Sequence, residues 1–289
     1  MWRMGLAAAL ALTIGLGPAQ GEDEDAARIV VAGGDLTEIV FALGAGDRIV
    51  GVDSTSNWPP EAAERAQVGY VRRLSAEGVL SLAPDLVIAA ADAGPQVALE
   101  QLGAAGVTIA QAPEAATAGE IPEKIAFVGE AIGRGDEAAE LVSAFEAAMA
   151  TVREKVAQLD GNPRVLFILS VQGGAPLVGG LDTTAHEMIT LAGGENAAAS
   201  IEGYKPMNRE GILAAAPDVI LLMEQHATRM GGAETILARP EIALTPAGQD
   251  GRAITMEGML LLGFGPRTPE AVAALARALH PESAAAVGL

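Results

Sequence analysis

The sequence has no cysteine, which excludes disulfides, thiolate metal sites and cysteine nucleophiles. Aromatic residues make up only 3% of the chain, so its two tyrosines and two tryptophans stand out as candidate functional residues. Basic residues are scarce, 18 against 37 acidic ones, and the formal net charge is −19. Nucleic acids and anionic membranes repel such a polyanion, so neither is expected as a partner.

The usual motifs of catalysis and of metal binding are also missing. The chain has no Gly-x-Ser-x-Gly sequence, and its three histidines, His186, His226 and His280, are far apart. Neither a hydrolytic triad nor a clustered metal site is therefore expected. Gly33-Gly34-Asp35 follows an apolar strand pattern but lacks the Gly-x-Gly-x-x-Gly spacing of a dinucleotide-binding loop. These absences favour a protein that is not an enzyme.

The first residues have the pattern of an export signal. Arg3 gives a positive start, residues 6–16 are apolar but too short to span a bilayer, and small residues lead up to Gly21. This pattern predicts a secretory signal peptide over residues 1–21, with the mature chain beginning near Glu22. No later stretch approaches the roughly 18 uninterrupted apolar residues of a transmembrane helix.

One segment of the sequence occurs twice. Residues 75–88 read SAEGVLSLAPDLVI and residues 208–221 read NREGILAAAPDVIL, which places Glu77 opposite Glu210. A Gly-Tyr pair precedes both copies, at Tyr70 and Tyr204. Each copy predicts a short helix that ends before Pro-Asp and a buried strand after it. Two distant copies indicate two similar half-molecules, and the helix–strand alternation predicts α/β architecture with mostly parallel sheets.

The rest of the chain follows the same alternation. Strands are expected at residues 28–32, 48–52, 86–90, 107–110, 165–169, 219–223 and 253–255. Helices are expected at residues 35–43, 96–102, 137–158, 183–191 and 269–279. Residues 170–174 and 224–232 show neither pattern, so a turn and a loop are expected there.

The helix expected at residues 137–158 is the longest. Its apolar residues recur at spacings of three and four, which places them on one face: Leu141, Phe145, Met149, Val152 and Val156. About 22 residues at 1.5 Å each give a length of ~33 Å, enough to join two lobes as a rigid strut. We therefore expect an N-terminal α/β lobe at residues 22–120, a helical segment at 121–160 and a C-terminal α/β lobe at 161–289.

Tyr70 is the main candidate for ligand binding, because two arginines, Arg72 and Arg73, lie close to it. A phenol ionises near pH 10, so a tyrosinate that binds a metal needs help from neighbouring cations or from the metal itself. Tyrosine is one of the known axial ligands of haem iron, and an arginine can pair with a carboxylate. The same pattern also fits a half-buried packing tyrosine beside two solvated arginines. The residues alone leave both interpretations open.

From residue 28 to about residue 279 the chain resembles the periplasmic haem-binding proteins of bacterial haem ABC importers. The resemblance rests on GGDLTEI at residues 33–39, GVDSTS at 51–56, GYVRRLSAEG at 69–78 and GYKP at 203–206. The third stretch is the most specific, because the haem branch has this tyrosine. The wider class, which includes vitamin B12 and siderophore binders, has two Rossmann-like lobes joined by one rigid helix.

The resemblance also implies a role and a location. We expect a periplasmic monomer that is not an enzyme and that binds haem as its transported ligand. Its partners would be an inner-membrane ABC permease and its ATPase, in haem-iron uptake. Two alternatives stay open: a vitamin B12 or iron–siderophore carrier of the same class, and a periplasmic enzyme that works on tetrapyrrole or metal.

By similarity, Tyr70 would be the axial iron ligand. Arg72, Arg73, Tyr204 and Lys205 would surround the haem, with Lys205 as a partner of a propionate group. No second ligand is expected from residues 170–174, because the histidine that some family members have there is absent.

Glu77 and Glu210 occupy the positions of the two glutamates that, in this class, bind arginines of the permease. The apolar Leu80 and Leu213, three residues further on, are expected to face the core. Gln225 stands where many relatives have an arginine, and His226 is next to it. We expect His226 to be a solvent-exposed loop residue and not an axial ligand; the alternative is that it binds the iron opposite Tyr70.

Overall fold

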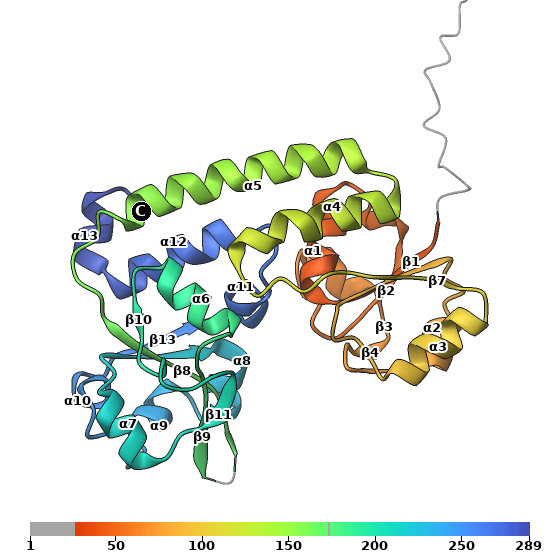
Figure 1. Ribbon diagram of the computed structural model, residues 1–289. Coiled ribbons are helices and arrows are strands. Elements are labelled where there is room, and N and C mark those ends of the chain that lie inside the picture. Colours follow the sequence, from red (N-terminus) through yellow and green to blue (C-terminus); the bar gives the residue numbers. More distant parts are fainter. Residues whose placement is uncertain (1–26, 173) are drawn as a thin grey trace, which may run out of the picture.

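The computed structural model describes residues 27–172 and 174–289. The signal peptide expected at residues 1–21 lies outside these residues. Two α/β lobes lie side by side, and a long helix spans them along one edge of the molecule (Figure 1). Among the described residues, no helix has both the length and the apolar character that crossing a membrane requires.

The N-terminal lobe contains a five-stranded sheet in the order β3-β2-β1-β6-β7, with all neighbours parallel. Its elements are β1 Ile29–Ala32, α1 Gly34–Ala42, β2 Ile49–Val52, β3 Ala66–Gln67, β4 Gly69–Tyr70, β5 Arg73–Leu74, α2 Ala76–Leu80, β6 Leu86–Ala89, α3 Gln96–Ala104 and β7 Thr108–Gln111. Along β1, Ile29 and Val31 face one hydrophobic core, and Val30 and Ala32 face another. This alternation, with helices covering both faces, explains why the central strands read as unbroken apolar runs.

The C-terminal lobe is built around a mixed sheet in the order β11-β9-β8-β12-β13, with β10 also paired to β8. Its strands are β8 Arg164–Gln172, β9 Ala175–Gly179, β10 Glu195–Asn196, β11 Tyr204–Pro206, β12 Val219–Met223 and β13 Ala253–Met256. Its helices are α6 Thr184–Leu191, α7 Arg209–Ala215, α8 Glu224–Arg229, α9 Ala233–Leu237, α10 Pro246–Asp250, α11 Gly258–Leu262, α12 Thr268–Leu279 and α13 Pro281–Ala286. The strand predicted at residues 219–223 is confirmed at both ends.

Two predictions for this lobe are wrong. Residues 170–172, expected in a turn, continue β8 and pair antiparallel with β9, for example Val171 with Pro176. The loop expected from residue 224 begins instead with helix α8. This helix has only six residues and no apolar stripe. What the sequence pattern could not show is that Ala227 packs into the core of the lobe.

The repeated segment has a structural counterpart in each lobe. The aspartate after Pro accepts a hydrogen bond from a backbone N–H at the start of the central strand. This bond is 2.8 Å long both for Asp85 with Arg28 and for Asp218 with Arg164. The Nε of each of these arginines donates to a carbonyl near the end of the repeated helix, at 3.0 and 2.9 Å. The repeat therefore encodes a joint between helix and strand that both lobes use.

The strut has the predicted length. Helix α4 Ile121–Ile132 turns back at Gly133, and α5 Gly135–Val156 runs for 22 residues. Helix α5 packs on α4 near the N-terminal lobe and on α12 of the C-terminal lobe. Of the predicted stripe, Phe145, Met149 and Val152 are buried in a core that also includes residues from both sheets. The two lobes thus share one continuous hydrophobic core under α5.

Candidate functional site

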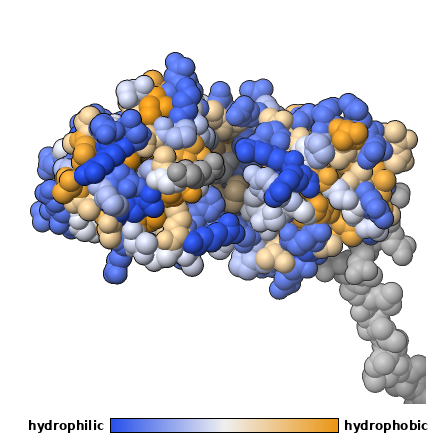
Figure 2. All heavy atoms as spheres, turned by 90° about the horizontal axis from the view of Figure 1, so that it is seen from below, coloured by the Kyte–Doolittle hydropathy of each residue, from blue (hydrophilic) through white to orange (hydrophobic). Residues whose placement is uncertain are grey.

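A recess separates the two lobes on the face opposite α5 (Figure 2). The hairpin of β4 and β5 lies on the side of the N-terminal lobe that faces the C-terminal lobe (Figure 1). Helix α8 and strand β11 lie on the side of the C-terminal lobe that faces the N-terminal lobe (Figure 1). The candidate residues Tyr70 and Tyr204 are in β4 and β11. The fold therefore brings the two repeated Gly-Tyr pairs to the edges of this recess.

Tyr70 is placed by the hairpin. Gly69 has φ +100°, which strongly favours glycine, and Tyr70 pairs across the hairpin with Arg73. The ring is half-buried, and the guanidinium of Arg73 lies 5.8 Å from its centroid, within cation–π range. The hairpin therefore holds Tyr70 and Arg73 in contact with each other.

Arg72 makes a different contact. Its Nε donates to Asp92 Oδ2 at 2.7 Å, and the two side chains form an ion pair. The pKa of Arg72 is raised, mainly by the hydrogen bond to Asp92 and also by the charge of Asp92. Tyr70 and Tyr204 would add to this effect if they were ionised, so Arg72 lies within electrostatic range of a tyrosine from each lobe. The sequence analysis missed Asp92, because only the folded chain places it beside the hairpin.

Tyr204 differs from Tyr70 in its surroundings. Its ring packs edge-to-face on Phe167, with centroids 6.4 Å apart. Thr184, the backbone N–H of Ala185 and Thr183, at the N-terminus of α6, act to lower the pKa of its phenol. Burial nevertheless raises the pKa of the phenol above its usual value, so Tyr204 stays neutral. With 38% of the residue exposed, Tyr204 offers the recess an aromatic surface and not a phenolate.

Lys205 is exposed on β11. Successive side chains of a strand point to opposite faces, so Lys205 points away from the side on which Tyr204 packs. Its ammonium group is accessible to an anionic partner at the rim of the lobe.

His226 and Gln225 lie in α8, so the expectation of a loop histidine in solvent is wrong. His226 is half-buried, and its Nδ1 lies 2.6 Å from the carbonyl oxygen of Leu169 at the end of β8. Since a carbonyl only accepts, this contact requires Nδ1 to carry the proton. It ties α8 to β8. Gln225 is exposed.

Glu77 and Glu210 are exposed, each in the first turn of its helix. The residue two positions before each glutamate caps the helix: Ser75 accepts from Gly78 N at 3.2 Å, and Asn208 accepts from Gly211 N at 2.8 Å. The two carboxylates are therefore displayed by matching backbone structures.

The prediction that Leu80 and Leu213 face the core is wrong. Val79 and Ile212 are fully buried instead, whereas Leu80 is 37% exposed and Leu213 is half-buried. In α2 the buried positions are Ala76 and Val79, three residues apart, which is the spacing of one helix face. The repeated leucines thus lie at the edge of the exposed surface that carries the glutamates.

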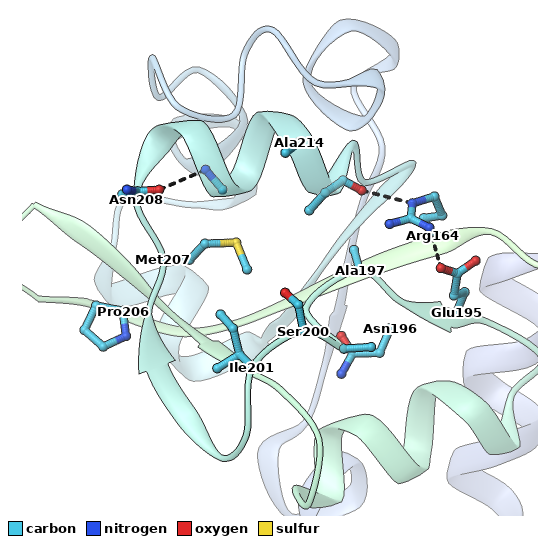
Figure 3. A pocket seen from close by; sticks show the side chains of 13 residues that line it. Arg164, Glu195, Asn196, Ala197, Ser200, Ile201, Pro206, Met207, Asn208 and Ala214 are labelled. Carbon is cyan, nitrogen blue, oxygen red and sulfur yellow. Dashed lines mark hydrogen bonds and ion pairs between the residues drawn. The ribbon is translucent and has the colours of Figure 1, made fainter.

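A cavity of about 570 Å³ lies elsewhere, between β10, β11 and α7 (Figure 3). Arg164 lines it but is engaged within the lobe, by an ion pair with Glu195 and by a hydrogen bond to the Ala215 carbonyl. These charged groups hold strands and helix together. Among the described residues, no group of three or more histidine, aspartate or glutamate side chains is arranged to hold a metal ion.

Several known proteins are similar to this chain. The family described as periplasmic binding protein matches residues 29–259. The apo form of the periplasmic haem-binding protein RhuT from Roseiflexus sp. RS-1 has a TM-score of 0.86 and 40% identity, covering 89% of this chain and 99% of its own. The periplasmic haem-binding protein BhuT in complex with two haems has a TM-score of 0.84 and 41% identity, with the same coverage. A vitamin B12-binding protein from Yersinia pestis (strain Pestoides F) is 28% identical over 218 residues, 75% of each chain.

Proposed function

Since the chain belongs to the periplasmic binding protein family, we propose that it binds haem in the recess between its lobes and delivers it to an inner-membrane ABC transporter. The observation that carries this proposal is Tyr70, placed at the recess by a two-stranded hairpin and flanked by Arg72 and Arg73. The similarity to RhuT and BhuT, at 40 and 41% identity over nearly their full lengths, supports it.

The main alternative is a vitamin B12 carrier of the same family. The similarity to the vitamin B12-binding protein supports it, but at 28% identity and over less of the chain. A corrinoid carrier also has no need of a tyrosinate ligand to iron. The basic setting of Tyr70 therefore favours haem.

We assign the following roles within the site. Tyr70 would bind iron as a phenolate, which the neighbouring guanidinium of Arg73 helps to stabilise. Arg72, which lies within electrostatic range of both tyrosines, would pair with one haem carboxylate. The exposed Lys205, on the face of β11 opposite Tyr204, would reach another carboxylate at the rim of the lobe. Tyr204, neutral because of its raised pKa, would pack its ring against the porphyrin.

The proposal also covers where the protein acts and whether it is an enzyme. The protein would be exported, act as a monomer and release its ligand chemically unchanged, so it would not be an enzyme. Its lobes would span residues 22–120 and 161–289, with a helical segment at 121–160 between them. The exposed Glu77 and Glu210, one on each lobe, would bind the permease.

A haem titration tests the proposal directly. Adding haem to the purified protein is expected to produce a saturable Soret band with the spectrum of a five-coordinate, tyrosinate-bound iron. The end point gives the number of haems bound per chain. A protein that develops no Soret band but binds cobalamin would contradict the proposal and support the alternative. Turnover of the porphyrin or of its metal would instead indicate an enzyme.

His226 gives a second prediction. The substitution His226→Ala is expected to leave the coordination spectrum of the haem complex unchanged, because we assign Nδ1 a structural role at the end of β8. It removes one hydrogen bond, which typically contributes about 1 kcal/mol to the free energy of unfolding, so the melting temperature should fall slightly. If this variant converts a six-coordinate spectrum into a five-coordinate one, His226 is a ligand through Nε2.

A further inference from the structure

A second group of hydrogen-bonded and charged side chains lies where the two lobes meet, at α1, the loop after β2, α4 and the segment that joins β13 to α12. We call this group the interlobe cluster. Its members are Asp35, Glu38, Asn57, Lys124, Glu257 and Arg267. The sequence analysis assigned no function to the cluster, and the haem site proposed above does not include it.

The strongest contact of the cluster is between Arg267 of the C-terminal lobe and Glu38 of α1. The Nε of Arg267 donates to Oε2 of Glu38 at 2.9 Å, and the terminal nitrogen NH2 pairs with Oε1, so the contact is bidentate. The two side chains are only 18 and 7% exposed. The guanidinium also stacks on Trp58 of the N-terminal lobe, 4.6 Å from the ring centroid. Burial raises the pKa of Glu38, although Arg267 opposes this effect.

Lys124 makes a second contact between the lobes. Its Nζ lies 2.5 Å from Asp35 Oδ2 in α1 and 3.1 Å from the carbonyl oxygen of Phe264. Lys124 is only 4% exposed, so these two partners replace the water that its ammonium group loses on burial. Phe264 adopts a left-handed backbone conformation, with φ +49°, in the turn whose carbonyl faces Lys124. One ammonium group thus joins α1, α4 and the turn before α12.

A third contact completes the cluster. Asn57 Nδ2 donates to Glu257 Oε1 at 3.0 Å. The same carboxylate caps α11, by accepting from the backbone N–H of Met259 at 2.9 Å and of Leu260 at 2.7 Å. The Met259 side chain also lies close to the backbone of α1, because a Cβ on Gly34 would lie 2.9 Å from Met259 Cε. The lobes therefore meet through directional contacts as well as through the shared apolar core.

We infer that the interlobe cluster sets the relative position of the two lobes, and with it the width of the recess into which haem binds. Helix α5 fixes how far apart the lobes are along its axis, but a lobe attached at one end of a helix can still rotate about that end. The buried, bidentate contact of Arg267 and the bridging contact of Lys124 resist such rotation. The part of this inference that concerns haem binding rests on the proposed function. The part that concerns the relative position of the lobes does not depend on that function.

The test combines small-angle scattering with a haem titration of the full chain. The native protein is expected to give nearly superimposable scattering curves with and without haem. In Arg267→Met, the empty protein should have a larger radius of gyration and should contract when haem is added. Its dissociation constant for haem should rise at least about tenfold, because only a fraction of the molecules hold the lobes at the right separation. In Arg267→Lys, which keeps the charge but loses the planar fork, both effects should be smaller.

Two further variants keep the test decisive. Glu38→Gln preserves the volume and some hydrogen bonding, so it tests the charge contact even if Arg267→Met folds poorly. Glu241→Gln is the matched control, because Glu241 is 12% exposed and pairs with Arg239 within the C-terminal lobe. Its scattering and haem affinity should equal those of the native protein.

Two outcomes separate the inference from the proposed function. If Glu38→Gln and Arg267→Met scatter and bind haem like the native protein, the cluster does not position the lobes. If the native protein binds no haem, the proposed function fails, and the scattering of the empty variants still tests the cluster. A larger radius of gyration in Glu241→Gln as well would also overturn the inference, because it would show a general loss of stability.

Discussion

The substitution Tyr70→Phe is expected to abolish the tyrosinate spectrum of the haem complex and to weaken haem binding by at least roughly a hundredfold. It removes the phenol oxygen but keeps the ring that packs in the N-terminal lobe. Losing a second-shell partner of a metal ligand typically costs 10- to 100-fold in affinity, so losing the ligand itself should reach or exceed about the upper value. The spectrum and the dissociation constant are measured in the same titration.

Tyr204→Phe is the matched control for this experiment. It removes a hydroxyl group that lies near the N-terminus of α6 and whose pKa is raised by burial. The tyrosinate spectrum should therefore persist, and the affinity for haem should change little. If Tyr70→Phe keeps the native spectrum and affinity, or if Tyr204→Phe loses the tyrosinate spectrum instead, the assignment of Tyr70 as the iron ligand is wrong.

Reversing the charge of both repeated glutamates, with Glu77→Lys and Glu210→Lys, is expected to stop haem uptake by a reconstituted transporter while haem binding stays intact. Both side chains are exposed at the N-termini of matching helices, and the adjacent buried residues Val79 and Ile212 already supply the packing of these helices. Facing like charges in an interface costs several kcal/mol, and each 1.4 kcal/mol is about tenfold in affinity. Each single reversal should have a partial effect.

The control for this experiment carries the same change of charge on another surface. Glu140→Lys and Glu146→Lys alter two exposed positions of α5, on the side of the molecule away from the recess. Transport by this variant should be normal. Normal transport by the Glu77→Lys, Glu210→Lys variant would show that these two carboxylates do not bind the permease.

Local patterns in the sequence were enough to predict much of the fold. The strand at residues 219–223 and the 22-residue length of α5 follow from apolar runs and from helical periodicity, which depend on neighbours in the chain. The repeated segment predicted two similar lobes because the same residues build the same joint twice, at Asp85 and at Asp218. The resemblance in residues 69–78 predicted a role for Tyr70, which lies in the β4–β5 hairpin.

Contacts between distant parts of the chain determined those parts of the fold and of the site that local sequence patterns could not predict. Strand β9 pairs antiparallel because the chain reverses after β8, and the six residues of α8 form a helix because Ala227 is buried against the sheet. Asp92 reaches Arg72 across 20 residues, and Arg267 reaches Glu38 across 229. Such pairs produce no periodic pattern in the sequence. A single charged residue looks the same in the sequence whether its side chain is solvated or pairs with a buried group on the other lobe. The sequence therefore predicted a role for Tyr70, whereas only the folded chain revealed what surrounds that tyrosine and which contacts join the two lobes.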